Sequence, residues 1–150
     1  MTNTAQVSTP FLALVLVAAG FAASTSLRAE PPTLDDVAGS TWELASSKYG
    51  DATEWENVSG EQRKIKMLTA TRFVWVSYES ASGAPQSSGG GTYTLNGPTY
   101  TEVIEFGAGD MKAMRGKKQV FSLDLKGDRL EQTGQLSTGL KIAEVWQRVR

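Results

Sequence analysis

Eight short runs rich in β-branched and aromatic residues constrain the fold of this chain more than any other feature of its sequence. Turn sequences separate them, and most of the breaks are short, so runs adjacent in sequence are expected to pair in space. The pattern predicts an all-β fold of eight antiparallel strands in up-and-down order, as a barrel or a sandwich. The expected strands are 41–48, 63–68, 71–79, 91–95, 98–106, 118–125, 129–135 and 141–149.

A short helical turn is expected before the first strand. Thr33-Leu34-Asp35-Asp36 has the spacing of a capping box, in which a threonine and an acidic residue three positions later satisfy each other's backbone N–H groups. Beyond this segment no window combines helical apolar periodicity with good helix formers.

The segment GGGTYTLNGPTYTEVIEF gives the clearest local prediction. A two-residue turn at Asn96-Gly97 would form a hairpin with tyrosine facing tyrosine and threonine facing threonine. The expected pairs are Leu95 with Pro98, Thr94 with Thr99, Tyr93 with Tyr100 and Thr92 with Thr101. Continuing the alternation places Glu102, Ile104 and Phe106 on the tyrosine face. The preceding Gly89-Gly90-Gly91 is expected to be a flexible approach to the strand or a bulge.

Composition excludes several classes of function. The chain has 150 residues, which suits one domain, and its formal charge of −1 offers no basic surface for DNA or RNA. It contains no Cys and no His, so disulfides, zinc fingers, Cys nucleophiles and Ser-His-Asp triads cannot form within it.

Residues 1–29 are expected to be a secretory signal peptide, followed by a single domain over 30–150. The apolar run from Phe11 to Ala23 is too short for a membrane-spanning helix, which needs roughly 20 residues. Small residues that suit cleavage follow it. The mature protein would then be secreted or periplasmic, without a stable membrane span; an uncleaved N-terminal anchor is the alternative.

The candidates for the wall of an interior cavity are four aromatic residues on the expected strands and two charged residues: Phe73, Trp75, Tyr93, Tyr100, Glu102 and Arg72. The aromatic residues either fill the barrel as core or line a pocket. Glu102 would lie among them, where a carboxylate needs a basic partner such as Arg72 or Lys64, or else a ligand or water. Arg63, Lys64 and Lys66 are interpreted as a solvated face or a cavity rim.

Two long connections, 50–62 and 107–117, carry apolar side chains on expected loops. Trp55 lies in the first, and Met111 and Met114 lie in the second. Such residues either fold back over the core or form a lid on a cavity mouth.

No catalytic arrangement emerges from the sequence. Glu102 and Glu105 are three positions apart on a strand and point to opposite faces, so they cannot flank one bond. No nucleophile, base and orienting residue can be combined. We therefore expect a protein that is not an enzyme and has no cofactor and no metal site.

A helical turn, a Trp on the first strand, an eight-strand meander and the final VWQRV together resemble the lipocalin and calycin-like β-barrels. More narrowly, SKYGD, RKIKMLTATRFVWVSYE, GGGTYTLNGPTYTEVIEF and EVWQRV look like a group of secreted bacterial lipocalin-like proteins without an assigned biochemical role. The resemblance implies that Trp42 packs at the closed end of the barrel under Arg148. It also implies that the barrel binds a small hydrophobic molecule.

The function expected from these observations is binding of a small apolar or amphipathic ligand by a monomer, with no nucleic-acid partner. A protein–protein module is the alternative, for example a periplasmic enzyme inhibitor whose Glu30-Pro31-Pro32-Thr33 tail enters a partner's cleft. An enzyme built on the same barrel is the third hypothesis.

Overall fold

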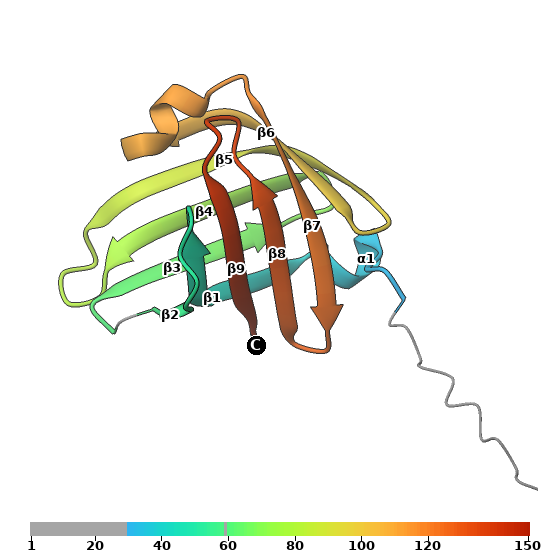
Figure 1. Cartoon of the computed structure of the whole chain (residues 1–150), viewed down its shortest axis with the longest axis horizontal. Coiled ribbons are helices and arrows are strands. Elements are labelled where there is room, and N and C mark those ends of the chain that lie inside the picture. Colours follow the sequence, from blue (N-terminus) through green and yellow to red (C-terminus); the bar gives the residue numbers. More distant parts are fainter. Residues whose placement is uncertain (1–29, 59) are drawn as a thin grey trace, which may run out of the picture.

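The computed structural model describes residues 30–58 and 60–150. The expected signal peptide, residues 1–29, lies outside the described residues. Nine antiparallel strands form one sheet that curls into a barrel (Figure 1). They are β1 (Ser40–Tyr49), β2 (Glu56–Asn57), β3 (Gln62–Leu68), β4 (Arg72–Glu79), β5 (Pro85–Asn96), β6 (Thr99–Ala108), β7 (Lys118–Lys126), β8 (Arg129–Gln135) and β9 (Lys141–Val149).

The predicted up-and-down meander is confirmed. Each of β3 to β9 pairs with its neighbour in sequence, and β1 closes the barrel by pairing with both β3 and β9. Eight strands make the barrel, and the two-residue β2 is an extra strand on β1. The main difference in bounds is β5, which begins at Pro85 and not at residue 91.

The predicted helical turn is α1 (Leu34–Val37). The Asp36 carboxylate accepts hydrogen bonds from the Thr33 backbone N–H at 2.8 Å and from the Thr33 hydroxyl at 2.6 Å. Val37 is fully buried, so this turn packs its apolar residue onto one end of the barrel. A 3-10 helix, η1 (Gly109–Met114), lies at the opposite end (Figure 1). Among the described residues, no helix has the length and apolar character needed to cross a membrane.

The register of the β5–β6 hairpin differs from the prediction by two residues. Asn96 pairs with Thr99, so the turn is Gly97-Pro98, and Tyr93 pairs with Glu102. The reason lies in Pro98, which has no N–H to close the turn that the prediction assumed. Gly97 has a φ of +55°, as the first position of a type II′ turn requires. A shift of two residues preserves the faces, so Tyr93 and Tyr100 still contact each other, with ring centroids 5.2 Å apart.

Phe106 does not lie on the tyrosine face as predicted, because β6 contains a bulge. Gly91 pairs with Ile104 and Gly90 pairs with Phe106, so Glu105 has no partner residue on β5. The inward–outward alternation of side chains along β6 is therefore reversed after Glu105. Phe106 is therefore about half exposed and lies over Gly90, where a Cβ would be 2.3 Å from its ring. The glycine run is part of β5 itself and lies opposite the bulge. Position 91 requires glycine, because a Cβ there would be 1.9 Å from the Val103 carbonyl oxygen.

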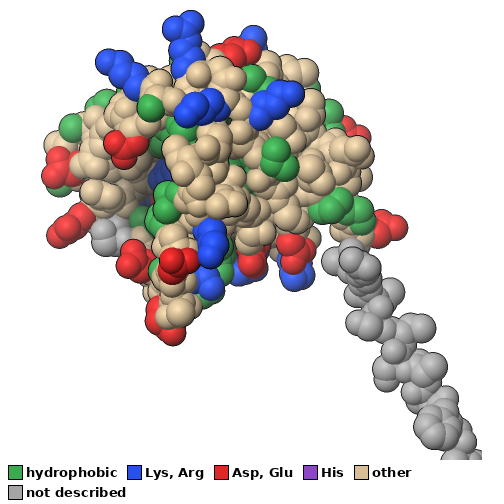
Figure 2. Space-filling model, turned by 45° about the horizontal axis from the view of Figure 1, so that its top comes forward, with side chains coloured by type: hydrophobic (Ala, Val, Ile, Leu, Met, Phe, Trp, Pro, Cys, Tyr) green, Lys and Arg blue, Asp and Glu red, His purple; other side chains and the backbone are tan. Residues whose placement is uncertain are grey.

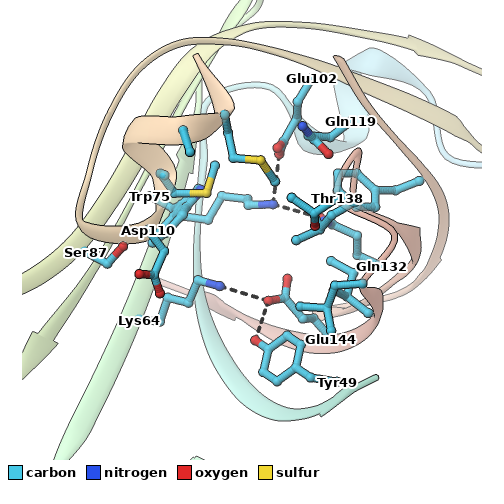
Figure 3. A pocket seen from close by; sticks show the side chains of 18 residues that line it. Tyr49, Lys64, Trp75, Ser87, Glu102, Asp110, Gln119, Gln132, Thr138 and Glu144 are labelled. Carbon is cyan, nitrogen blue, oxygen red and sulfur yellow. Dashed lines mark hydrogen bonds and ion pairs between the residues drawn. The ribbon is translucent and has the colours of Figure 1, made fainter. Parts of the chain in front are cut away.

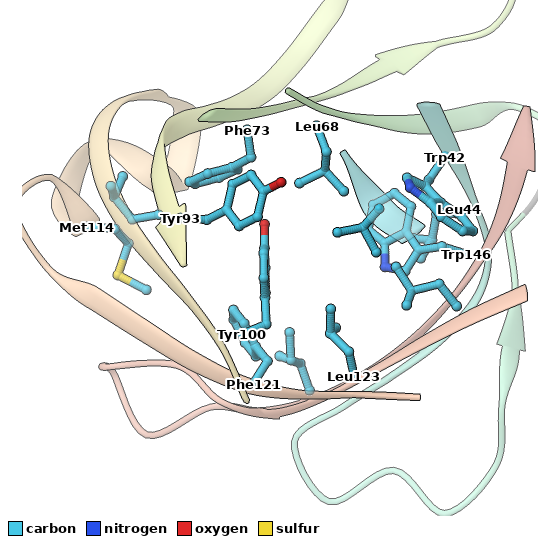
Figure 4. Close-up of a cluster of buried hydrophobic side chains, with 14 residues drawn as sticks. Trp42, Leu44, Leu68, Phe73, Tyr93, Tyr100, Met114, Phe121, Leu123 and Trp146 are labelled. Carbon is cyan, nitrogen blue, oxygen red and sulfur yellow. The ribbon is translucent and has the colours of Figure 1, made fainter. Parts of the chain in front are cut away.

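Inward-facing side chains from the strands form one hydrophobic core (Figure 4). Near α1 this core consists of large apolar residues, among which Trp42 and Trp146 are fully buried. Arg148 covers this end, with its guanidinium carbon 4.4 Å from the centroid of the Trp42 ring. It also donates a hydrogen bond to the Asp36 carbonyl at 2.7 Å and so connects β9 to α1.

Candidate functional site

A cavity of about 380 Å³ occupies the end of the barrel opposite α1. The surface is hollowed on this side of the molecule (Figure 2), and Figure 3 shows the side chains that face the cavity. We call it the inner cavity. Its lining residues are Tyr49, Lys64, Lys66, Trp75, Ser87, Glu102, Asp110, Met111, Ala113, Met114, Gln119, Phe121, Gln132, Leu136, Thr138, Leu140, Ile142 and Glu144.

One part of the lining is apolar. The 3-10 helix η1 contributes Met111, Ala113 and Met114, and the connection between β8 and β9 contributes Leu136 and Leu140. Phe121, Ile142 and Trp75 add aromatic and aliphatic surface from the strands. The long connection 107–117 therefore brings both of its methionines to the cavity.

The other part of the lining is a polar layer, which we define as Lys64, Lys66, Glu102, Gln119, Gln132 and Glu144. All six side chains come from strands, at positions where the alternation of the barrel turns them inward. Only Lys64 among them is not fully buried, with about a fifth of its side chain exposed.

Lys66 is the centre of one half of this layer. Its ammonium donates to Glu102 Oε1 at 3.1 Å and to Gln132 Oε1 at 2.7 Å. The Lys66 and Glu102 side chains are only 3% and 4% exposed. A buried ion pair of this kind is tolerated because each charge has a partner, and removing either partner leaves an uncompensated charge.

Lys64 and Glu144 form the other half. Glu144 Oε1 accepts hydrogen bonds from the Lys64 ammonium at 2.9 Å and from the Tyr49 hydroxyl at 2.7 Å (Figure 3). Burial alone would raise the pKa of Glu144, but the Lys64 and Lys66 ammonium groups lower it below its usual value. Burial would likewise lower the pKa of Lys64, and the Glu144 carboxylate raises it. Burial and the neighbouring Glu144 charge raise the pKa of Tyr49 to about 12.

Aromatic rings surround both ammonium groups. Lys64 Nζ lies 4.5 Å from the centroid of the Trp75 ring, and Lys66 Nζ lies 5.0 Å from that of Trp146 and 5.6 Å from that of Tyr100. Such cation–π contacts stabilise a buried cation. The Tyr100 hydroxyl and the Trp146 indole nitrogen are buried without a hydrogen-bond partner among the described residues.

A second hollow of about 660 Å³ lies beside the inner cavity, beneath β2 and the connection after it. Most of the residues that line it are polar, including Ser47, Asn57 and Ser77. The two spaces share Tyr49, Lys64, Trp75 and Ser87, so they meet around the Lys64 side chain.

The structure separates the residues that the sequence grouped as one cavity wall. Trp75 and Glu102 line the inner cavity. Phe73, Tyr93 and Tyr100 are buried in the core below it, and the Tyr93 hydroxyl donates to the Thr69 carbonyl at 2.6 Å.

Arg72 does not lie on the wall. It points outward from β4 and pairs with the exposed Glu105 at 2.7 Å, so Lys66 is the basic partner of Glu102.

Sequence reasoning missed most of the polar layer. Lys66 was assigned to a solvated face or a rim, although it pairs with Trp42 on one neighbouring strand and with Trp75 on the other. Side chains of directly paired residues lie on the same face of a sheet, so the position of Lys66 between two tryptophans was the available signal. Gln119, Gln132 and Glu144 share a strand face with Phe121, Leu130 and Trp146, respectively, which is a similar signal. It was outweighed because polar residues on strands usually face solvent.

Comparison with known proteins supports the fold and little beyond it. No protein-family model matches the chain, and no curated protein matches it. A solved lipocalin-like protein from Bacteroides uniformis is similar to it with a TM-score of 0.54 and 19% sequence identity, over 75% of this chain and 97% of that one. The chain has a lipocalin-like β-barrel fold.

Two further solved structures are similar to the chain in fold. An uncharacterized protein from Bacteroides eggerthii has a TM-score of 0.54 and 14% identity, over 76% of this chain and 100% of that one. A redesigned β-barrel has a TM-score of 0.50 and 17% identity, over 78% of this chain and 95% of that one. At these identities the likeness concerns the fold alone.

Proposed function

We propose that this lipocalin-like barrel binds a small amphipathic molecule in the inner cavity and performs no chemistry on it. The observation that carries the proposal is the divided lining of this 380 Å³ space, which is apolar on the side of η1 and polar across the strands. Small-molecule sites have this character, with a mostly apolar surface and a few placed polar groups that fix orientation.

The apolar side suits the body of such a ligand. Met111, Met114, Leu136 and Leu140 come from η1 and from the β8–β9 connection, which together border the open end. A ligand that displaces water from these side chains gains the free energy of burying apolar area. The polar layer then meets the opposite end of the ligand.

The carboxylates of the site are engaged in ways that favour binding over catalysis. Glu102 and Glu144 each accept a hydrogen bond from a lysine, and the charged neighbours lower the pKa of Glu144. A general acid at neutral pH needs a raised pKa, so Glu144 is tuned away from that role.

The Glu30–Thr33 tail was the basis of the alternative, a protein–protein module. Pro32 is buried against the barrel, and Thr33 is held by Asp36. A tail packed in this way is poorly suited to enter the cleft of a partner. The apolar run within residues 1–29 still supports a secreted or periplasmic location for the binding protein.

Titration with the uncharged fluorescent probe N-phenyl-1-naphthylamine tests the proposal. We expect its emission to rise on adding the full chain, and energy transfer from tryptophan to accompany binding because Trp75 lines the cavity. Ala113→Trp should weaken binding about tenfold or more, since a large ring on η1 would fill the space that the probe needs.

Ala70→Trp is the matched control. Ala70 is exposed in the turn between β3 and β4 and does not line the cavity. The Ala70→Trp variant should therefore bind the probe as the unaltered chain does. Absence of binding by the unaltered chain, or equal binding by the two variants, would contradict the proposal.

A further inference from the structure

The inner cavity holds two cations, of which Lys66 is fully buried and Lys64 mostly buried, and their charges are already balanced. Lys66 pairs with Glu102 at 3.1 Å and Lys64 pairs with Glu144 at 2.9 Å. The polar layer therefore carries two positive and two negative charges. Asp110, at the edge of the same cavity, adds a further carboxylate and forms no ion pair within the described part of the chain.

The same two lysines retain hydrogen-bond donors. An ammonium group has three N–H donors and no acceptor. Within residues 30–58 and 60–150, Lys66 uses two of them, on Glu102 and Gln132, and Lys64 uses one, on Glu144. The aromatic faces of Trp75 and Trp146 cover part of both ammonium groups, but a ring is a weaker acceptor than an oxygen atom.

These two observations constrain the polar end of a ligand in different ways. Free N–H groups favour an oxygen that accepts hydrogen bonds. The balanced charge disfavours an oxygen that brings its own negative charge, because a further buried carboxylate would have no counter-ion and would also face Asp110. A cationic end is disfavoured too, since it accepts no hydrogen bond and would approach two lysines.

We propose that the inner cavity selects amphipathic ligands whose buried end is an uncharged oxygen acceptor, such as the carbonyl of an amide, ester or ketone, over ligands that end in a carboxylate. This selectivity rests on the proposed binding function. The residues that set it are Lys64 and Lys66 as donors, with Glu102 and Glu144 as the carboxylates that cancel their charge.

Three ligands with the same apolar chain test the selectivity: decanamide, decanoate and decylammonium. Each displaces N-phenyl-1-naphthylamine from the full chain at about pH 7.5, where decanoate is ionised and the amide is neutral. We expect decanamide to bind about tenfold or more tightly than either charged ligand. Equal or tighter binding of decanoate or of decylammonium would overturn the inference.

Two further measurements connect the selectivity to the charge balance. In the unaltered chain, decanoate binding should strengthen as the pH falls from about 7.5 to about 5, because the fraction of neutral acid increases, while decanamide binding stays constant. In Glu144→Gln, which keeps an oxygen for Tyr49 and Lys64 but removes the negative charge, decanoate should gain about tenfold relative to decanamide.

The outcomes separate this inference from the proposed function. If the unaltered chain does not bind the probe, the proposed function is wrong. If the probe binds and decanoate displaces it as well as decanamide does or better, the function stands and the selectivity is wrong. Because the pH series uses the unaltered chain, it remains decisive even if Glu144→Gln does not fold.

Discussion

The two ends of this barrel are built by the same strands but filled with opposite chemistry. On β3, Leu68 faces inward near α1, whereas Lys66 and Lys64 face inward toward the cavity. On β8, Leu130 faces inward near α1 and Gln132 faces inward toward the cavity. The alternation of a strand determines which side chains point inward, and the residue chosen at each inward position determines whether that layer is packed or left open.

Each end satisfies its buried groups differently. Near α1, large apolar side chains contact one another, and Arg148 covers Trp42 from outside. In the polar layer, stability depends on hydrogen bonds and balanced charge, for which Lys66 and Glu102 are the clearest example. A substitution near α1 should therefore destabilise the fold by loss of packing, whereas a substitution in the polar layer should do so by leaving a charge without its partner.

Trp42→Ala should have the largest effect, a loss of about 3–5 kcal/mol in the free energy of unfolding. Trp42 is fully buried, and its indole N–H donates to the Ser40 hydroxyl at 2.6 Å, so the substitution removes both packing and a hydrogen bond. Denaturant-induced unfolding, followed by far-ultraviolet circular dichroism, measures this loss. Met67→Ala is a control on the outer face of β3, where Met67 is 43% exposed. A loss below about 1 kcal/mol for Trp42→Ala would contradict the central role of this end.

Lys66→Met should cost about 3 kcal/mol, because it leaves the Glu102 carboxylate buried without its counter-ion. The double variant Lys66→Met/Glu102→Leu removes both charges and should recover most of that loss. The same unfolding measurement, arranged as a double-mutant cycle, gives the coupling between the two residues. Independent, additive effects of Lys66→Met and Glu102→Leu would show that charge balance does not govern this layer.

The apolar end could largely be predicted from sequence, and the polar layer could not. Trp42 and the alternating apolar residues around it have the signature that hydrophobic patterning detects. Lys64 and Lys66 lie at alternate positions with the buried Leu68 on β3 and therefore face inward, but a lysine on a strand normally faces solvent, so the pattern was interpreted as a solvated face or a cavity rim. The register of the β5–β6 hairpin was predictable in principle, since the missing N–H of Pro98 is a property of the sequence.

Other parts of the site depend on non-local geometry. The ion pair between Lys66 and Glu102 joins residues 36 positions apart, and that between Lys64 and Glu144 joins residues 80 positions apart. No local signal in a single sequence specifies such partners. The bulge that turns Phe106 outward likewise arises from the pairing of β5 with β6, and the cavity wall formed by η1 depends on how the 107–117 connection folds back.

The smallest predicted effect concerns Tyr49, at the boundary between the cavity and solvent. Its pKa is raised from 10.0 to about 12, so between these values the folded chain retains a proton that the unfolded chain has lost. Stability from this group is present below pH 10 and decreases as the pH rises toward 12. Tyr49→Phe has no proton to lose, so its unfolding free energy should decrease less steeply over this range. Because Tyr49 is 40% exposed, solvent screens the Glu144 charge, and we expect the two curves to converge by only about 1 kcal/mol. Denaturant unfolding of both chains at a series of alkaline pH values measures the two slopes. Parallel curves would mean that neither burial nor the Glu144 carboxylate raises the pKa of Tyr49 in the folded chain.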